Sequence, residues 1–221
     1  MSNEVPAIEM RGVGFRYDGR RVISDFSLRV ARGEKVTLTG PSGSGKSTVL
    51  KSVLGLVVPQ SGSISILGRE INGHDVWAAR RSLAYVAQEP ELGTGTAGEA
   101  IERPFAFKAN AALRVNLDRL PALLERFGLS RTLLDKEAST LSGGEKQRIA
   151  VVSAILLDRP IILLDEASSA LDRNNKQRLA DYFRQASNLT VLSVSHDTEW
   201  QGFSSRVVDM ADHAHAEGAQ T

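Results

Sequence analysis

Apolar residues fall into two kinds of short run along this chain. The runs at 161–164 and 189–194 are apolar on both faces, whereas 8–11, 27–30 and 63–66 alternate apolar and polar residues. Continuous apolar runs are typical of parallel strands buried between two helical layers, and alternation is typical of half-exposed antiparallel strands. The pattern predicts an α/β protein with a mostly parallel central sheet and an antiparallel β layer beside it.

Helical patterns separate these runs. A helix is predicted over 46–54, between strands at 35–39 and 82–86. Residues 97–134 show no strand pattern, and 109–127 carry apolar residues at helical spacing, namely Leu113, Leu117, Leu120, Leu124 and Phe127. We therefore expect a helical insertion within the α/β core.

Composition narrows the classes of protein. The 221 residues include 27 Lys and Arg against 26 Asp and Glu, a net charge of +1, which disfavours a dedicated binder of nucleic acid or anionic lipid. The longest apolar stretch, 149–157, is shorter than the roughly 18 residues that a membrane span needs. The absence of cysteine excludes disulfides and thiolate metal sites. No secretory signal is visible, so a cytoplasmic location is expected.

A glycine-rich segment joins the predicted strand at 35–39 to the predicted helix at 46–54. Glycines let successive backbone N–H groups face an anion, and the helix N-terminus adds the positive end of its dipole. Lys46 would add a full charge and Ser47 a hydroxyl for Mg²⁺. The candidate phosphate-binding residues are Gly40, Pro41, Ser42, Gly43, Ser44, Gly45, Lys46, Ser47 and Thr48. The alternative is an ordinary glycine-rich turn, which the flanking strand and helix disfavour.

Two adjacent acids follow the apolar run at 161–164. Asp165 and Glu166 stand at the carboxyl end of a predicted parallel strand, where doubly wound sheets bind their ligands. Asp165 is therefore a candidate Mg²⁺ ligand. Glu166 would polarise a water that attacks the terminal phosphate of a nucleotide. The alternative is an acidic pair that ends the strand and caps the following helix.

A second candidate anion site lies in the segment 141–148, which reads Leu-Ser-Gly-Gly-Glu-Lys-Gln-Arg. Ser142, Gly143 and Gly144 before a helical run predict an N-cap hydroxyl followed by two bare backbone amides. At this segment the sequence resembles the ATP-binding-cassette (ABC) ATPase family. The resemblance implies that this site reaches ATP held by the phosphate loop of a second copy, so that a homodimer encloses two ATP molecules.

The resemblance continues, in order, over residues 8–209. Tyr17 stands where family members stack an aromatic ring on adenine. Gln88 resembles the glutamine that ligates Mg²⁺ and links the nucleotide to the helical subdomain. A plain strand-edge tyrosine and a solvated loop glutamine are the alternatives.

Two further positions match the family after the acids. Residues 169–172, ending at Asp172, resemble the D-loop. His196 resembles the switch histidine that contacts the γ-phosphate and orders Glu166 with the attacking water. A histidine at a strand end can also have only a structural role.

Two polar groups receive no functional assignment. His213 and His215 have no third ligand nearby in the sequence, so we expect a polar tail there and no metal site. Arg16, Arg20 and Arg21 are expected to form a solvated face.

The resemblance implies the domain organisation. One ABC ATPase domain, a P-loop NTPase (RecA-like) α/β fold, is expected over 1–210. Its core and β layer comprise 1–87 and 150–210, and the inserted helical subdomain, with the Ser-Gly-Gly motif, comprises 88–149. Residues 211–221 are expected to be a flexible tail.

The expected function is that of an ATP-hydrolysing subunit that uses ATP and Mg²⁺ to drive a separate membrane permease from the inner face of the cell membrane. No nucleic acid is expected as a partner.

The segment after Gln88 gains glycines at 93 and 95, so a more flexible loop is expected where transport cassettes meet the permease. A soluble ABC ATPase of DNA repair or translation is the rival, and it would carry long coiled-coil insertions or a second cassette. A small P-loop kinase would lack the Ser-Gly-Gly motif.

Only a resemblance indicates which substrate is transported. Residues 170–176 and Arg103–Phe105 look like the bacterial ATPases for iron and related metal export, the FetA/YbbL type. Cassettes for lipoprotein release or small-solute transport are similar at these positions and remain alternatives.

Overall fold

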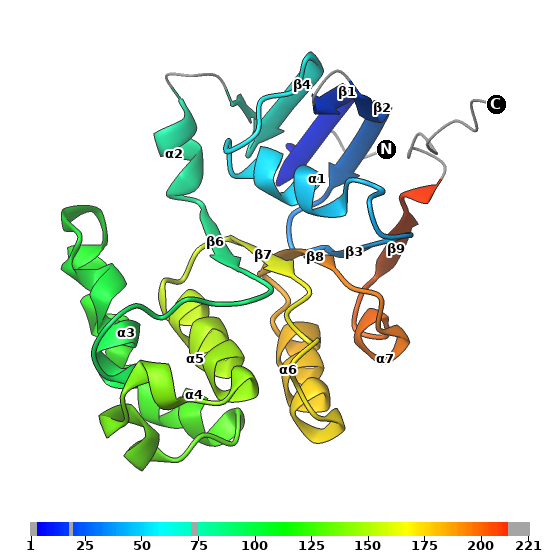
Figure 1. The fold of residues 1–221 in the computed structure, drawn as a ribbon. Helices are drawn as coiled ribbons and strands as arrows, with labels where there is room; N and C mark the ends of the chain where they lie inside the picture. The colour runs from blue at the N-terminus through cyan, green and yellow to red at the C-terminus, as the bar shows by residue number, and fades with distance from the viewer. Residues whose placement is uncertain (1–3, 18–19, 72–74, 212–221) are drawn as a thin grey trace.

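The computed structural model describes residues 4–17, 20–71 and 75–211. Two sheets and a group of short helices make up the fold (Figure 1). In this described part of the chain, no helix is long and apolar enough to cross a membrane.

The central sheet is parallel throughout. Its five strands are ordered β6 (Leu83–Val86), β7 (Ile161–Asp165), β8 (Thr190–Val194), β3 (Lys35–Thr39) and β9 (Arg206–Asp209). Every residue of β7 and β8 is buried, as their apolar sequences require. The predicted parallel sheet is therefore confirmed, and β9 is an edge strand that the sequence pattern did not reveal.

The second sheet is antiparallel, with the order β2 (Arg20–Val30), β1 (Ile8–Tyr17), β4 (Ser61–Ile66) and β5 (Arg69–Glu70). Strands β1 and β2 are longer than the alternating runs predicted. Their pairing register shifts between Met10 and Val13, and Gly12 and Asp25 both have positive φ. Such bulges interrupt the alternation, so the sequence pattern showed only part of each strand.

Helices cover both faces of the parallel sheet. Helix α1 (Lys46–Val53) lies between the two sheets, whereas α5 (Gly143–Leu156) and α6 (Arg173–Gln185) lie on the other face (Figure 1). The short helices α2 (Val76–Arg80) and α7 (Thr198–Gln201) precede β6 and β9.

The predicted helical insertion is present beside α5. It contains α3 (Ala97–Glu102), the 3₁₀ segments η1 (Arg103–Ala106) and η2 (Lys108–Arg119), α4 (Leu120–Arg126), η3 (Arg131–Asp135) and η4 (Ala138–Thr140). The helical spacing of apolar residues over 109–127 spans two elements, because the α-helix begins only at Leu120 and η2 precedes it. Pro121 has no N–H to donate to the carbonyl of Leu117, so an α-helical ladder cannot run through this point.

Side chains pack in two buried clusters on opposite faces of the parallel sheet. Ile161 and Leu163 face the cluster between the sheets, and Ile162 and Leu164 face the cluster with α5 and α6. The expected boundaries of core and helical subdomain stay a prediction. Residues 212–221, most of the expected tail, lie outside the described residues.

Candidate functional site

The phosphate loop connects β3 to α1 and places the Lys46 side chain against its own backbone. Lys46 Nζ donates hydrogen bonds of 2.8 Å to the carbonyl oxygens of Gly40 and Pro41. Burial lowers the pKa of Lys46, and the charges of Glu166, Asp165 and Asp209 oppose that shift. The ammonium group therefore lies within the field of three carboxylates.

The loop offers polar groups to an anion. Ser44 is 1% exposed, and its Oγ is buried without a hydrogen-bond partner. Gly43 has φ 81°, and a Cβ there would meet nothing within 4 Å, so the space beside it is open. Gly45 has φ 90°, and a Cβ there would lie 2.5 Å from Ile23 Cδ1. These features fit a nucleotide phosphate group held by backbone amides.

Asp165 lies between two hydroxyl groups. Ser47 Oγ donates to Asp165 Oδ1 at 3.2 Å, and Tyr85 Oη donates to Asp165 Oδ2 at 3.3 Å. Asp165 is 5% exposed. Burial, together with the neighbouring Asp165 charge, raises the pKa of Tyr85 to about 12, so its hydroxyl stays protonated at neutral pH.

Glu166 is held between the loop after β6 and the loop after β8. Gln88 Nε2 donates to Glu166 Oε2 at 3.0 Å, and His196 Nε2 lies 3.8 Å from Glu166 Oε1. The Glu166 backbone has φ 46°, an unfavourable value for a side chain of this kind, and Glu166 N donates to Val194 O. Strained backbone of this type is concentrated at functional sites.

The donor set fits a magnesium ion. Mg²⁺ prefers oxygen ligands and usually takes one or two protein carboxylates together with phosphate oxygens and water. Asp165 supplies a buried carboxylate and Ser47 a hydroxyl. Gln88, whose amide nitrogen donates to Glu166, supplies an amide oxygen as a further donor of the kind that Mg²⁺ accepts. Among the described residues, no group of three or more His, Cys, Asp or Glu could hold a metal by itself.

The second candidate anion site is the N-terminus of α5. Ser142 caps this helix in a capping box: its Oγ accepts from Glu145 N at 3.3 Å, and Glu145 Oε2 accepts from Ser142 N at 2.8 Å. Ser142 Oγ also donates to Glu145 Oε2 at 2.8 Å. The backbone hydrogen bond from Ser142, followed by the one from its hydroxyl, lowers the pKa of Glu145.

The two glycines after Ser142 pack beside Ala170 and Leu171. A Cβ on Gly144 would lie 2.9 Å from Ala170 O, and a Cβ on Gly143 would lie 3.8 Å from Ala170 Cβ. Asp172 then caps α6 and accepts from Asn175 N at 2.9 Å. The structure thus places the Ser-Gly-Gly motif against the segment that resembles the D-loop.

The structure gathers the predicted residues into two groups. One group surrounds Asp165 and Glu166 at the carboxyl ends of the parallel strands and contains Lys46, Ser47, Gln88 and His196. The other contains Ser142, Gly143, Gly144 and Asp172. The side chains of Tyr17 and Arg20, and both His213 and His215, lie outside the described residues. Arg16 and Arg21 are exposed.

Sequence reasoning missed two residues of the first group. Tyr85 lies three residues before Gln88, and Asp209 ends β9 with its Oδ1 next to Gly40. Asp209 follows the same rule that selected Asp165, a carboxylate at the carboxyl end of a parallel strand, but β9 was not predicted. No sequence signal fixes which face of β6 the Tyr85 ring occupies.

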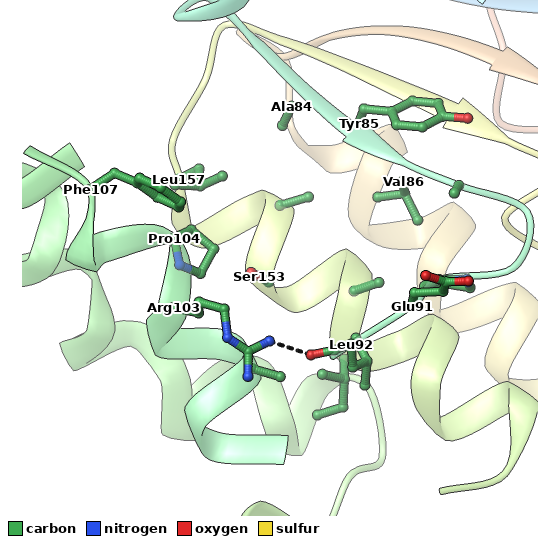
Figure 2. Close-up of a pocket in the computed structure, with 16 residues that line it drawn as sticks. Ala84, Tyr85, Val86, Glu91, Leu92, Arg103, Pro104, Phe107, Ser153 and Leu157 are labelled. Atoms are coloured by element: carbon green, nitrogen blue, oxygen red, sulfur yellow. Dashed lines mark hydrogen bonds between the residues drawn. The ribbon is translucent and has the colours of Figure 1, made fainter. Parts of the chain in front are cut away.

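A groove of about 360 Å³ lies between β6, the start of the helical insertion and α5 (Figure 2). We call it the Arg103 groove; its lining includes Ala84, Val86, Pro104, Phe107, Ile149 and Leu157. Arg103 donates to Leu92 O and Thr94 O, so it anchors the glycine-containing loop that was expected to be flexible. Phe107 at the rim is 65% exposed.

Comparison with known proteins identifies the family of the chain. The model of the ABC transporter family matches residues 23–169. The chain is 34% identical over 93% of its length to the energy-coupling factor transporter ATP-binding protein EcfA1 of Enterococcus faecalis, covering 76% of that protein. It is 32% identical over 97% of its length to the probable iron export ATP-binding protein FetA of Escherichia coli, covering 95% of that protein.

Solved structures of ABC proteins have the same fold. A bacterial Atm1-family ABC exporter with ATP bound superposes with a TM-score of 0.82 at 30% identity, over 96% of this chain and 38% of the exporter chain. The ATP-binding cassette MJ0796, in a dimeric post-hydrolysis state with ADP and Pi, superposes with a TM-score of 0.76 at 26% identity, over 93% and 94% of the two chains.

The fold and the site define an ATP-hydrolysing cassette. The chain belongs to the ABC transporter family, as its ATP-binding subunit. The predicted family, fold class and ATPase activity are confirmed.

Proposed function

We propose that two copies of this chain close around two Mg²⁺-ATP molecules, hydrolyse them and thereby drive a separate permease, with iron or another metal as the exported cargo. The observation that carries the hydrolytic part is the convergence of Gln88 and His196 on Glu166, next to the phosphate loop. A carboxylate held in this way is suited to general-base chemistry on a water molecule.

Each residue of the first group that the sequence predicted has a role in this proposal. Lys46 and the backbone amides of residues 40–48 bind the phosphates, and Ser47, Asp165 and Gln88 hold Mg²⁺. Mg²⁺ supplies neutralisation of the phosphate charge. Glu166 accepts the proton of the attacking water. His196 contacts the γ-phosphate and orients Glu166 relative to it.

The homodimer follows from the second anion site. Ser142, Gly143 and Gly144 form a helix N-terminus without a lysine, which suits a phosphate already bound to the Lys46 loop of another copy. Asp172 lies next to this motif, and Tyr17 stacks on adenine. The dimeric state of the MJ0796 cassette supports this arrangement.

The permease is proposed to occupy the Arg103 groove. An apolar lining with the exposed Phe107 at its rim suits a short helix of a membrane protein. Docking there would place this chain on the cytoplasmic face of the membrane.

The similarity to FetA, over 95% of the length of that protein, supports metal export. EcfA1 favours a second candidate, a transporter of a small solute. Deletion of the gene in its native host distinguishes these two: metal export predicts that cellular iron or another metal rises, measured by elemental mass spectrometry. An unchanged metal content together with lost uptake of a solute would favour the second candidate.

Hydrolysis and dimerisation are tested with Glu166→Gln. This variant should bind ATP and accumulate as a dimer in size-exclusion chromatography with light scattering, while phosphate release falls by about 10²- to 10⁴-fold. Glu125→Gln, at an exposed position on α4, is the matched control and should behave as the unchanged chain. Normal turnover by Glu166→Gln would remove Glu166 from the general-base role.

A further inference from the structure

The hydroxyl groups of Tyr85 and Ser47 contact different oxygens of the candidate magnesium ligand Asp165. Tyr85 Oη lies 3.3 Å from Asp165 Oδ2, whereas Ser47 Oγ lies 3.2 Å from Asp165 Oδ1. Each carboxylate oxygen thus has its own donor, one from β6 and one from α1. The two donors together define the direction of the carboxylate plane.

The register of the parallel sheet produces this contact. Tyr85 on β6 is paired with Leu163 on β7, two residues before Asp165. Side chains alternate along a strand, so Tyr85, Leu163 and Asp165 share the face that looks toward α1. Figure 2 shows the Tyr85 ring on the other side of β6 from the Arg103 and Phe107 side chains.

Removal of the Tyr85 hydroxyl would leave Oδ2 of Asp165, a residue that is 5% exposed, without this donor. The carboxylate would then keep the hydrogen bond from the Ser47 hydroxyl, and one contact in place of two would hold its orientation. Asp165 would therefore be less well oriented to bind a metal together with Ser47. Hydrogen bonds to metal-ligating carboxylates typically contribute 10- to 100-fold to metal affinity.

We propose that Tyr85 is a positioning residue for the magnesium site: its hydroxyl fixes the orientation of Asp165 so that Asp165 and Ser47 face the metal together. The inference rests on the proposed Mg²⁺-ATP site and adds a residue that the phosphate loop and the strand-end acids do not include. Tyr85 itself touches neither nucleotide nor metal in this role.

The test uses Mn²⁺, a paramagnetic substitute for Mg²⁺, and a non-hydrolysable imido analogue of ATP. Free and bound Mn²⁺ are measured by electron paramagnetic resonance on the analogue-loaded chain, which gives a dissociation constant without any turnover. Tyr85→Phe removes only the hydroxyl and should raise this constant by about tenfold. Its affinity for the analogue in the presence of EDTA should equal that of the unchanged chain.

Tyr182→Phe is the matched control, because it removes a hydroxyl from a tyrosine on α6 whose ring packs against Phe127 and Phe183. It should leave the Mn²⁺ dissociation constant unchanged. A Tyr85→Phe constant equal to that of the unchanged chain would overturn the role of Tyr85 and leave the proposed function intact. Weakened analogue binding in EDTA would also overturn it, since the hydroxyl would then support the nucleotide pocket as a whole. Absence of Mn²⁺ binding by the unchanged chain would instead overturn the magnesium site of the proposed function, and this inference with it.

Discussion

The side-chain amide of Gln88 donates a 3.0 Å hydrogen bond to Glu166 Oε2, so the loop that leaves β6 is bonded directly to the acid that leaves β7. His196 approaches the other oxygen of the same carboxylate from the loop after β8. Glu166 therefore receives support from two strands that neighbour its own in the sheet. Its orientation depends on side chains that are far apart in the sequence.

Gln88→Ala is expected to lower ATP turnover by about 100-fold, because a reacting group misplaced by about 1 Å can lose this much. Phosphate release at saturating ATP and Mg²⁺ measures the effect. Gln177→Ala, at an exposed position on α6, controls for the loss of an amide side chain. Turnover by Gln88→Ala within a factor of two of the unchanged chain would mean that Glu166 needs no support from the loop after β6.

Gly144→Ala is expected to destabilise the fold by about 1–3 kcal/mol, since the added Cβ would lie 2.9 Å from the backbone oxygen of Ala170. Gly143→Ala makes an ordinary 3.8 Å contact and should unfold at the same or a slightly higher urea concentration, because alanine favours helix. Urea unfolding followed by circular dichroism compares the two variants. Equal stability would show that the segment 168–171 moves aside without cost.

Glu145 should give the stability a defined pH dependence. Hydrogen bonds from Ser142 lower the pKa of Glu145 below its ordinary value of 4.5. The ionised form is therefore favoured by folding, and its contribution to the unfolding free energy is present above pH 4.5 and disappears as the pH falls through the lowered pKa.

Glu145→Gln removes this titration. The difference in unfolding free energy between the unchanged chain and Glu145→Gln should stay constant from pH 7 to about pH 5 and then shrink toward pH 3. Denaturant unfolding at several pH values measures it. A difference that grows as the pH falls would have the wrong sign for a capping carboxylate.

Arg103→Ala should loosen the loop beside the Arg103 groove without affecting the ATP site. The guanidinium of Arg103 donates to Leu92 O and Thr94 O, and its loss should speed amide hydrogen exchange over residues 92–95 by about tenfold, the effect of losing about 1.4 kcal/mol of local stability. Turnover of the isolated chain should stay within about twofold. Arg114→Ala removes an exposed arginine paired with Glu102 and is the control. Unchanged exchange at 92–95 would show that the loop holds its shape without Arg103.

The sequence was sufficient for the elements whose chemistry is local. The phosphate loop, the acids Asp165 and Glu166, and the capped start of α5 follow from residue types at fixed spacing, and the structure places them at strand and helix ends as expected. The continuous apolar runs likewise predicted β7 and β8.

The remaining features depend on tertiary pairing. The contact between Tyr85 and Asp165 depends on how β6 is aligned with β7, and no residue type in the sequence indicates that alignment. Asp209 depends on a mostly exposed edge strand with little apolar pattern. The bulges at Gly12 and Asp25 and the 3₁₀ segment before Pro121 reflect local backbone geometry that hydrophobic periodicity does not encode.

The two faces of strand β6 contact different sites. Ala84 and Val86 line the Arg103 groove, while Tyr85 between them reaches the acid at the end of β7, and Gln88 follows two residues later. Side chains alternate along a strand, so neighbouring residues of β6 face the groove and the acids in turn. The groove and the hydrogen bonds that hold Asp165 and Glu166 therefore share one short strand and the loop that follows it.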